Sequence, residues 1–102
     1  KQTMLPKPGE GPSAEARENG FYKLNLIGKD SDGNQLRVTV TGDRDPGYGS
    51  TCKMLGETAV CLLKDIKKED LHGGFWTPAT AMGQKLIDRL TASAGLTFEV
   101  EE

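Results

Sequence analysis

The sequence predicts an α+β fold: a small antiparallel sheet, made of a hairpin and a C-terminal strand, packed against two helices, with an irregular Pro/Gly-rich N-terminal arm. Residues 21–27 and 36–40 alternate apolar and polar side chains with a period of two, which is typical of strands. Residues 51–64 and 78–94 repeat apolar side chains at helical spacing, and residues 96–100 alternate again. At 102 residues the chain has the length of one packed domain.

The first twenty residues are rich in proline and glycine, a composition that resists regular structure. Within them, Ser13 precedes "AEARE" and could cap one or two helical turns, which Gly20 would end. We therefore expect an irregular arm over residues 1–20 and a single α+β domain over residues 21–102. The chain begins at Lys1 rather than at methionine, which fits a piece of a longer protein.

The two N-terminal alternating runs predict a β-hairpin. Asp32-Gly33-Asn34 supplies residues that tolerate a positive φ in the turn between them. The period of two places one set of side chains on a common apolar face: Tyr22, Leu24, Leu26, Leu36, Val38 and Val40. Arg37, Thr39 and Thr41 fall on the opposite face, which we expect to meet solvent or a partner.

The first long helix, over residues 51–64, has an apolar arc much wider than a surface helix needs. Only a narrow polar strip that contains Lys53, Glu57 and Lys64 remains. This helix therefore needs neighbours on more than one side. Either the sheet and the second helix both cover it, or another domain or subunit does.

The second long helix begins with a clear signal, because Thr77 fits the N-cap and Pro78 fits the first helical position. Its apolar side chains form an ordinary one-sided stripe, and Gly95 ends it. Gly83 lies on that stripe although glycine destabilises a helix interior, which predicts that another element approaches closely there. Gly56 in the first helix supports the same expectation.

Composition excludes several classes of function. The formal charge of −2 gives no reason to expect nucleic acid or an anionic membrane as a partner. No apolar run approaches the roughly 20 residues of a transmembrane helix. Cys52 and Cys61 fall in one predicted helix, about 13 Å apart along its axis, so we expect free thiols in a cytoplasmic protein. No further Cys or His stands at zinc-ligand spacing, so no metal site is expected.

The segment "GDRDPGYGST", residues 42–51, joins the hairpin to the first long helix. Pro46-Gly47 fits the centre of a type II turn, and Ser50 or Thr51 fits a helix cap. Alternatively, the N-terminus of the helix binds an anion with help from neighbouring side chains. Neither of the glycine-rich nucleotide-binding motifs is present. Asp43 and Asp45 flank Arg44, and we expect them to satisfy turn backbone groups.

A second glycine-containing corner is "HGGFWTPAT", residues 72–80. Phe75 or Trp76 either packs on the following helix as a hydrophobic staple or forms a wall that faces a substrate. His72 is the only histidine, and its charged, glycine-rich setting favours exposure rather than catalysis. The candidate substrate-pocket residues from both corners are Arg44, Asp45, Tyr48, Ser50, Thr51 and Trp76.

Four ordered blocks carry a family resemblance: "LPKPGEGPSAEARENGFY", "GDRDPGYGSTCKMLGETAVCL", "GGFWTPATAMGQKLIDRL" and "GLTFEV". Together they cover nearly the whole chain. They resemble the C-terminal end of the saccharopine dehydrogenase-like oxidoreductases, the group that includes the mycobacterial trans-acting enoyl reductases.

The resemblance implies a parent of several hundred residues, in which an N-terminal Rossmann domain binds NAD(P) and a C-terminal α+β domain dimerises or shapes the substrate pocket. This chain lacks the nucleotide loop, so it holds no cofactor-binding or catalytic residues of its own. We expect a substrate-side or interface domain that is inactive alone, with the Rossmann domain and a second subunit as partners. The alternative is a free-standing ligand-binding or dimerisation module without catalytic activity. An independent enzyme is disfavoured, because no complete catalytic set is visible.

Overall fold

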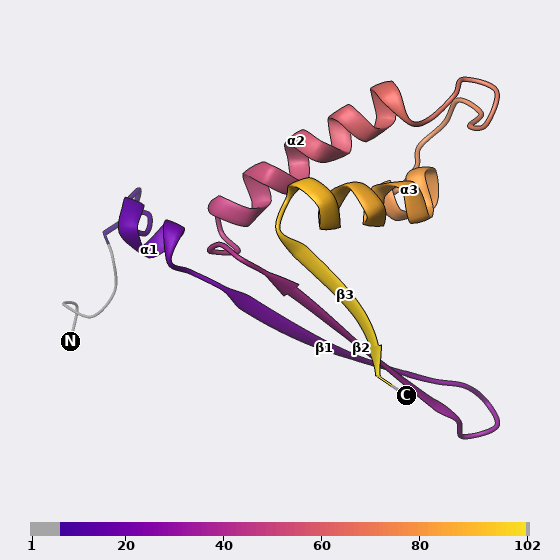
Figure 1. The fold of residues 1–102 in the computed structure, drawn as a ribbon, viewed down its shortest axis with the longest axis horizontal. Helices are drawn as coiled ribbons and strands as arrows, with labels where there is room; N and C mark the ends of the chain where they lie inside the picture. Colours follow the sequence, from indigo (N-terminus) through magenta and orange to yellow (C-terminus); the bar gives the residue numbers. More distant parts are fainter. Residues whose placement is uncertain (1–6, 102) are drawn as a thin grey trace.

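The computed structural model describes residues 7–101 and shows three helices and three strands within them (Figure 1). In chain order they are α1 (Ala14–Glu18), β1 (Tyr22–Lys29), β2 (Gln35–Gly42), α2 (Gly49–Lys64), α3 (Pro78–Ser93) and β3 (Leu96–Glu101). The strands form one antiparallel sheet in the order β1-β2-β3. Helices α2 and α3 pack on each other at one end of the sheet. The expected α+β class is therefore confirmed.

Local sequence signals explain the hairpin and the short helix. Gly33 has a φ of +87°, and the Asp30 carboxylate accepts hydrogen bonds from the backbone N–H groups of Asp32 and Asn34. This anchored turn sets a register in which Leu26 lies opposite Val38. In the arm, Ser13 accepts a hydrogen bond from the Ala16 N–H and caps α1, as its position in the sequence predicts.

The sheet has one apolar and one polar face. Side chains alternate along each strand, and the register places apolar residues of neighbouring strands opposite one another. The apolar face of the sheet consists of Tyr22, Leu24, Leu26, Leu36, Val38, Val40, Leu96, Phe98 and Val100. On the polar face Ile27 is the one apolar side chain among residues 22–29, 35–42 and 96–101. The expectation that Thr39 meets solvent or a partner is wrong. Thr39 is buried, with its hydroxyl 2.7 Å from Glu101 Oε1 and 3.1 Å from Asn25 Oδ1.

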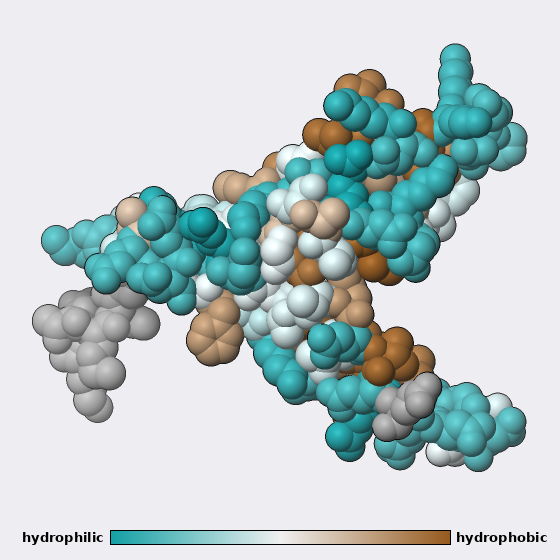
Figure 2. Space-filling view, viewed as in Figure 1, coloured by the Kyte–Doolittle hydropathy of each residue, from teal (hydrophilic) through white to brown (hydrophobic). Residues whose placement is uncertain are grey.

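A small core lies where the helices meet the sheet. Its buried apolar residues are Cys61, Met82, Leu86, Leu90, Ala94 and Leu96. The helices cover only this end, so Leu26, Leu36 and Val100 on the apolar face stay at least half exposed. Figure 2 shows the resulting hollow between the helical layer and the sheet, with hydrophobic surface beside it. The predicted packing of two helices on the sheet is thus restricted to one end.

Helix α2 is covered on one side only. Cys61 is buried and Met54 is partly buried against the core, whereas Leu55, Leu62 and Leu63 are 71%, 50% and 80% exposed. We call these three residues the α2 stripe. The first of the two explanations for the wide apolar arc, cover by both the sheet and the second helix, is therefore wrong. The other explanation, cover by another domain or subunit, stays a prediction.

The expected close approach at Gly56 and Gly83 is also wrong. A Cβ atom built at either glycine would have no other group within 4 Å. Gly83 instead has a φ of +50° and a ψ of −131°, which interrupt α3 with a kink. Glycine adopts a positive φ without the steric strain of other residues, so backbone conformation, and not packing, explains its presence.

An ion-pair cluster ties the end of α2 to α3. The Arg89 guanidinium donates to the Asp65 carboxylate at 2.7 Å and 3.1 Å and to Glu57 at 3.1 Å. These hydrogen bonds raise the pKa of Arg89, and Arg89 lowers the pKa of Asp65. Burial raises the pKa of the neighbouring Cys61 thiol, which therefore stays protonated at neutral pH. Cys52 and Cys61 are free, as the sequence predicts.

Candidate functional site

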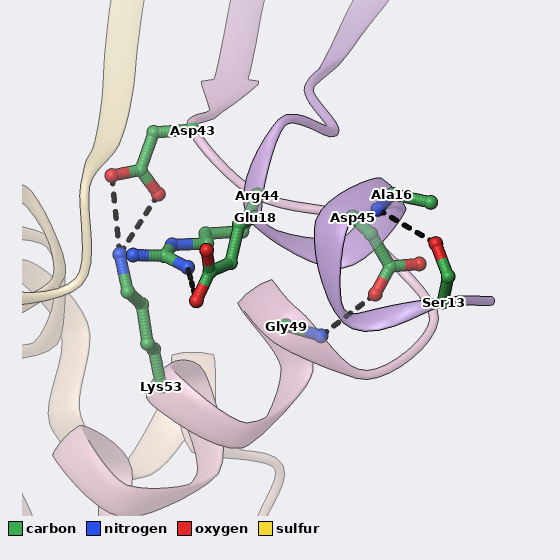
Figure 3. Close-up of polar contacts among 8 residues, drawn as sticks. All are labelled: Ser13, Ala16, Glu18, Asp43, Arg44, Asp45, Gly49 and Lys53. Carbon is green, nitrogen blue, oxygen red and sulfur yellow. Dashed lines mark hydrogen bonds and ion pairs between the residues drawn. The ribbon is translucent and has the colours of Figure 1, made fainter. Parts of the chain in front are cut away.

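Residues 42–51, hereafter the corner, form a turn that is built around Asp45 (Figure 3). The Asp45 carboxylate accepts hydrogen bonds from the backbone N–H groups of Gly47, Tyr48 and Gly49 at 3.0, 3.0 and 2.8 Å. The bond from Gly49 contributes most to the lowered pKa of Asp45. The carboxylate therefore acts as the cap of α2, from outside the helix.

Two predictions about the local structure of the corner are wrong. Gly47 is not among the glycines with the positive φ that a type II turn requires. Helix α2 begins at Gly49, with Tyr48 at the N-cap and no side-chain hydrogen bond from that position, so neither Ser50 nor Thr51 caps it. Asp45 takes the capping role instead, because a carboxylate at the start of an Asx turn reaches several successive N–H groups. The prediction that the aspartates of the corner satisfy turn backbone is confirmed for Asp45.

The alternative of an anion site at this helix N-terminus is disfavoured by the geometry. Three of the backbone donors are taken by Asp45 Oδ1 and Oδ2, and the Ser50 N–H donates to the Asp45 carbonyl at 2.8 Å. The carboxylate also places a negative charge at the positive end of the helix dipole. An incoming phosphate would find no free donor at these positions and would be repelled.

Ser50 and Thr51 serve the fold. Ser50 is fully buried, and its hydroxyl lies 2.9 Å from that of Tyr22. The Tyr22 ring lies so close to the Gly42 Cα that a side chain at position 42 would collide with it. The Thr51 hydroxyl donates to the Pro46 carbonyl at 2.6 Å. These contacts fasten the start of α2 to the ends of β1 and β2.

Arg44, Tyr48 and Thr51 are at least partly exposed at the corner, and of these Thr51 is engaged with the Pro46 carbonyl. Arg44 is 3.9 Å from Glu18 in α1, at a partly exposed position. Tyr48 is 56% exposed, and its ring lies near Gly11 of the arm. The arm therefore borders this part of the corner, and both side chains could also face a group that approaches from outside.

Sequence reasoning missed a clamp beside the corner. Lys53 donates to Asp43, just after β2, at 2.9 Å (Figure 3). It also donates to the carbonyl of Ala94 at 3.4 Å, so it joins the end of β2, α2 and the α3–β3 turn. The Asp43 carboxylate lies against Gly95. Lys53 was visible as part of a polar strip, but its partners lie 10 and 41 positions away in the sequence.

Replacement of Asp45 by asparagine is expected to remove an acid-sensitive part of the stability. A carboxyl whose pKa is lowered by folding stabilises the protein above its unfolded pKa, near 3.8, and this contribution is lost as the pH falls through the lower folded pKa. In urea melts between pH 7 and pH 2, the variant should be less stable at pH 7 and should converge on the wild type in acid. Asp32→Asn in the exposed hairpin turn is the control, and an Asp45→Asn profile parallel to the wild type would contradict the cap.

Trp76 lies away from the other candidates. It is 48% exposed, its indole N–H donates to the His72 carbonyl at 2.9 Å, and it lines a groove of about 420 Å³ together with Thr58 and Leu62 of α2. Those two residues are about 14–20 Å further along α2 than Gly49. The structure therefore does not bring Trp76 together with the corner. Phe75 is fully exposed and does not act as a staple.

The described residues contain no group of three His, Cys, Asp or Glu side chains that could hold a metal ion. Within residues 7–101, none of the helices has the length and apolar character needed to cross a bilayer. The fold and the corner thus define a small α+β domain with large uncovered apolar surfaces.

The chain is similar to mycobacterial trans-acting enoyl reductases. It is 41% identical over 96 residues to a protein provisionally given that name in Mycobacterium tuberculosis H37Rv, and 36% identical over 89 residues to the trans-acting enoyl reductase of Mycobacterium ulcerans. These matches cover 94% and 87% of this chain. The chain spans only 23% and 21% of the lengths of these relatives. No protein-family model and no solved structure matches the chain. The resemblance to trans-acting enoyl reductases is confirmed, whereas the wider saccharopine dehydrogenase-like grouping stays a prediction.

Proposed function

We propose that this chain is the substrate-side or interface domain of an NAD(P)-dependent oxidoreductase of the trans-acting enoyl reductase type, within the saccharopine dehydrogenase-like group. The similarity to proteins with that name, over about a quarter of their length, supports the class. On this proposal the chain is inactive by itself, and a separate Rossmann domain supplies the cofactor site.

The α2 stripe is the observation that carries the proposal. Leu55, Leu62 and Leu63 form an apolar surface on α2 that the described residues of this chain leave half or more exposed. An exposed row of leucines on a helix is costly in water and is typical of a surface that packs against another domain. We assign the α2 stripe to the contact with the Rossmann domain.

The local chemistry of the chain argues against a cofactor site of its own. A dinucleotide binds where a strand passes through a glycine-rich turn into a helix whose N–H groups are free for the pyrophosphate. The segment β2–corner–α2 has this order of elements, but the first two N–H groups of α2, those of Gly49 and Ser50, donate to the carboxylate and the carbonyl of Asp45. Arg44 and Tyr48 remain as residues that could line the substrate pocket of the whole enzyme.

Titration of NADPH into the chain tests the proposal. We expect no specific binding by calorimetry or by nicotinamide fluorescence at concentrations up to the millimolar range. The Asp45→Asn variant is titrated alongside the wild type. The substitution weakens the interaction of residue 45 with the N-terminus of α2 but introduces no nucleotide-binding motif. Micromolar affinity of the wild-type chain for NADPH would overturn the division of roles between the two domains.

The free-standing binding module is less well supported. Such a module would bind an anionic ligand at the corner, but the Asp45 carboxylate occupies that position.

A further inference from the structure

The connection between α2 and α3, residues 65–77, carries two exposed aromatic side chains. Phe75 is fully exposed, and Trp76 is 48% exposed. Exposed aromatic surface is unfavourable in water, and aromatic side chains are enriched where a protein meets a partner or the interface of a membrane. The connection lies at the end of α2 that is remote from the corner and from α1 (Figure 1). These two side chains therefore belong to a surface that is separate from the corner.

The turn that carries the aromatic side chains is ordered. The Trp76 indole N–H donates to the His72 carbonyl at 2.9 Å and closes the turn. Ile66 packs against the core, and Leu71 is partly buried. A surface that is already formed loses less conformational entropy on binding than a disordered one. The turn thus presents its aromatic side chains before any partner binds.

The end of α2 and the connection carry an excess of positive charge that the formal charge of −2 for the whole chain conceals. Arg89 of α3 pairs with Asp65 at 2.7 Å, and Lys85 of α3 lies 3.7 Å from Asp70. Of the acidic residues in this connection, only Glu69 has no such partner within residues 7–101. Three exposed lysines of this region also form no ion pair within those residues: Lys64, Lys67 and Lys68.

The lysines and the aromatic turn lie at the same end of the molecule. His72 and Trp76 line a groove of about 420 Å³ together with Leu62 of α2. Leu62 belongs to the last turn of α2, which ends at Lys64. Figure 2 shows hydrophobic and hydrophilic surface next to each other at this end. We call Phe75, Trp76 and the three lysines the aromatic loop.

We propose that the aromatic loop binds the surface of an anionic lipid bilayer, with Phe75 and Trp76 inserted between the headgroups and the lysines beside the phosphates. Phenylalanine and tryptophan are typical of segments that lie in the membrane interface. Each lysine close to an anionic bilayer strengthens binding roughly five-fold. Interfaces between proteins are enriched in aromatic residues but depleted of lysine. The combination of both residue types therefore fits a lipid surface better than it fits another protein.

The proposed lipid contact does not rest on the proposed function. The aromatic loop contains none of the residues of the α2 stripe, which we assign to the Rossmann domain. A peripheral contact of this kind also needs no helix that crosses the bilayer. The NADPH titration contains no lipid, and vesicle binding requires no cofactor. The failure of either proposal therefore leaves the other standing.

Binding of the chain to vesicles tests the proposal. With vesicles of phosphatidylcholine and phosphatidylglycerol, half of the wild type is expected to co-sediment at roughly 0.1–1 mM accessible lipid. Vesicles of phosphatidylcholine alone should bind at least about 10-fold more weakly. Trp76 is the only tryptophan of the chain, so it reports the contact directly. Its fluorescence emission should shift to shorter wavelength on binding and should be quenched by brominated lipid.

The aromatic part of the contact is tested by Phe75→Ala, which is expected to weaken binding about 10-fold because less apolar surface enters the bilayer. Phe21→Ala is the matched control. Phe21 is 80% exposed and precedes β1, so the same chemical change there should leave vesicle binding unaltered. Both side chains are exposed, and circular dichroism confirms that the two variants fold.

The charged part of the contact is tested by the double variant Lys67→Ala/Lys68→Ala, which is expected to weaken binding to the anionic vesicles roughly 25-fold. Lys23→Ala/Lys29→Ala is the control. It removes the same two charges from exposed positions of β1, outside the aromatic loop, and should bind like the wild type.

Several outcomes would overturn the proposal. A wild type that stays in the supernatant at roughly 5 mM anionic lipid would leave the aromatic loop to a protein partner. Equal effects of the two phenylalanine variants, or of the two double lysine variants, would place the lipid contact elsewhere on the chain. Co-sedimentation without any change in the emission of Trp76 would equally exclude insertion of this turn.

Discussion

Replacement of Leu90 by alanine is expected to lower the free energy of unfolding by about 3 kcal/mol, within the usual range of 2–5 kcal/mol for a buried leucine. Leu90 is 7% exposed and belongs to a core of six buried apolar residues among those that the structure describes. A core this small leaves little stability in reserve. The variant should therefore be largely unfolded at 25 °C, as measured by circular dichroism and by the urea midpoint.

Leu63→Ala is the control for Leu90→Ala, because it makes the same chemical change on a side chain that is 80% exposed. Its effect on the free energy of unfolding should stay within about 0.5 kcal/mol. Comparable losses in the two variants would mean that the core does not lie between α3 and the sheet. The comparison also distinguishes Leu90, which stabilises the fold of this chain, from Leu63, which we assign to the contact with another domain.

Gly95→Ala is expected to destabilise the protein by about 2–4 kcal/mol. Gly95 has a φ of +71°, and a methyl group there would collide with the Asp43 carboxylate. Backbone strain alone contributes about 1–2 kcal/mol. Displacement of Asp43 would also break the clamp with Lys53, which joins β2, α2 and the α3–β3 turn.

Gly56→Ala is the control, and we expect it to change the free energy of unfolding in the opposite direction. Gly56 lies inside α2, and a Cβ atom there would have no other group within 4 Å. Alanine should stabilise the helix by about 0.5–1 kcal/mol, because glycine loses more backbone entropy when the helix forms. Urea melts of both variants measure the difference, and a destabilised Gly56→Ala would indicate that an unseen neighbour packs against that side of α2.

Features that depend on neighbouring residues could be predicted from the sequence. The alternating and helical periods gave the correct number and order of the main elements, and Thr77-Pro78 marked the start of α3. The cap of α2 was missed although it is local. The hydroxyls of Ser50 and Thr51 fit the general preference for a helix cap, whereas Asp45 competes from further upstream and forms three hydrogen bonds instead of one.

Features that depend on distant residues could not be predicted in this way. A helical projection places Gly83 on an apolar stripe but contains no information about its φ, so the kink was mistaken for a packing contact. The period of two identified the apolar face of the sheet, but the angle at which α3 leaves it depends on the turn at Gly95 and on the Lys53 clamp. For the same reason, the roles of Ser50 beneath Tyr22 and of Lys53 beside Ala94 emerge only in three dimensions.

The polar triad around Thr39 shows how unevenly the sheet is connected along the chain. Thr39 and Asn25, on the hairpin, are 14 positions apart, whereas Thr39 and Glu101 of β3 are 62 positions apart. The entropy lost on closing a loop grows with its length, and distant pairings slow folding. We therefore expect the hairpin to close before β3 pairs with it. The last strand of the sheet closes a loop that contains both long helices, residues 43–95, so its pairing carries the larger entropy cost.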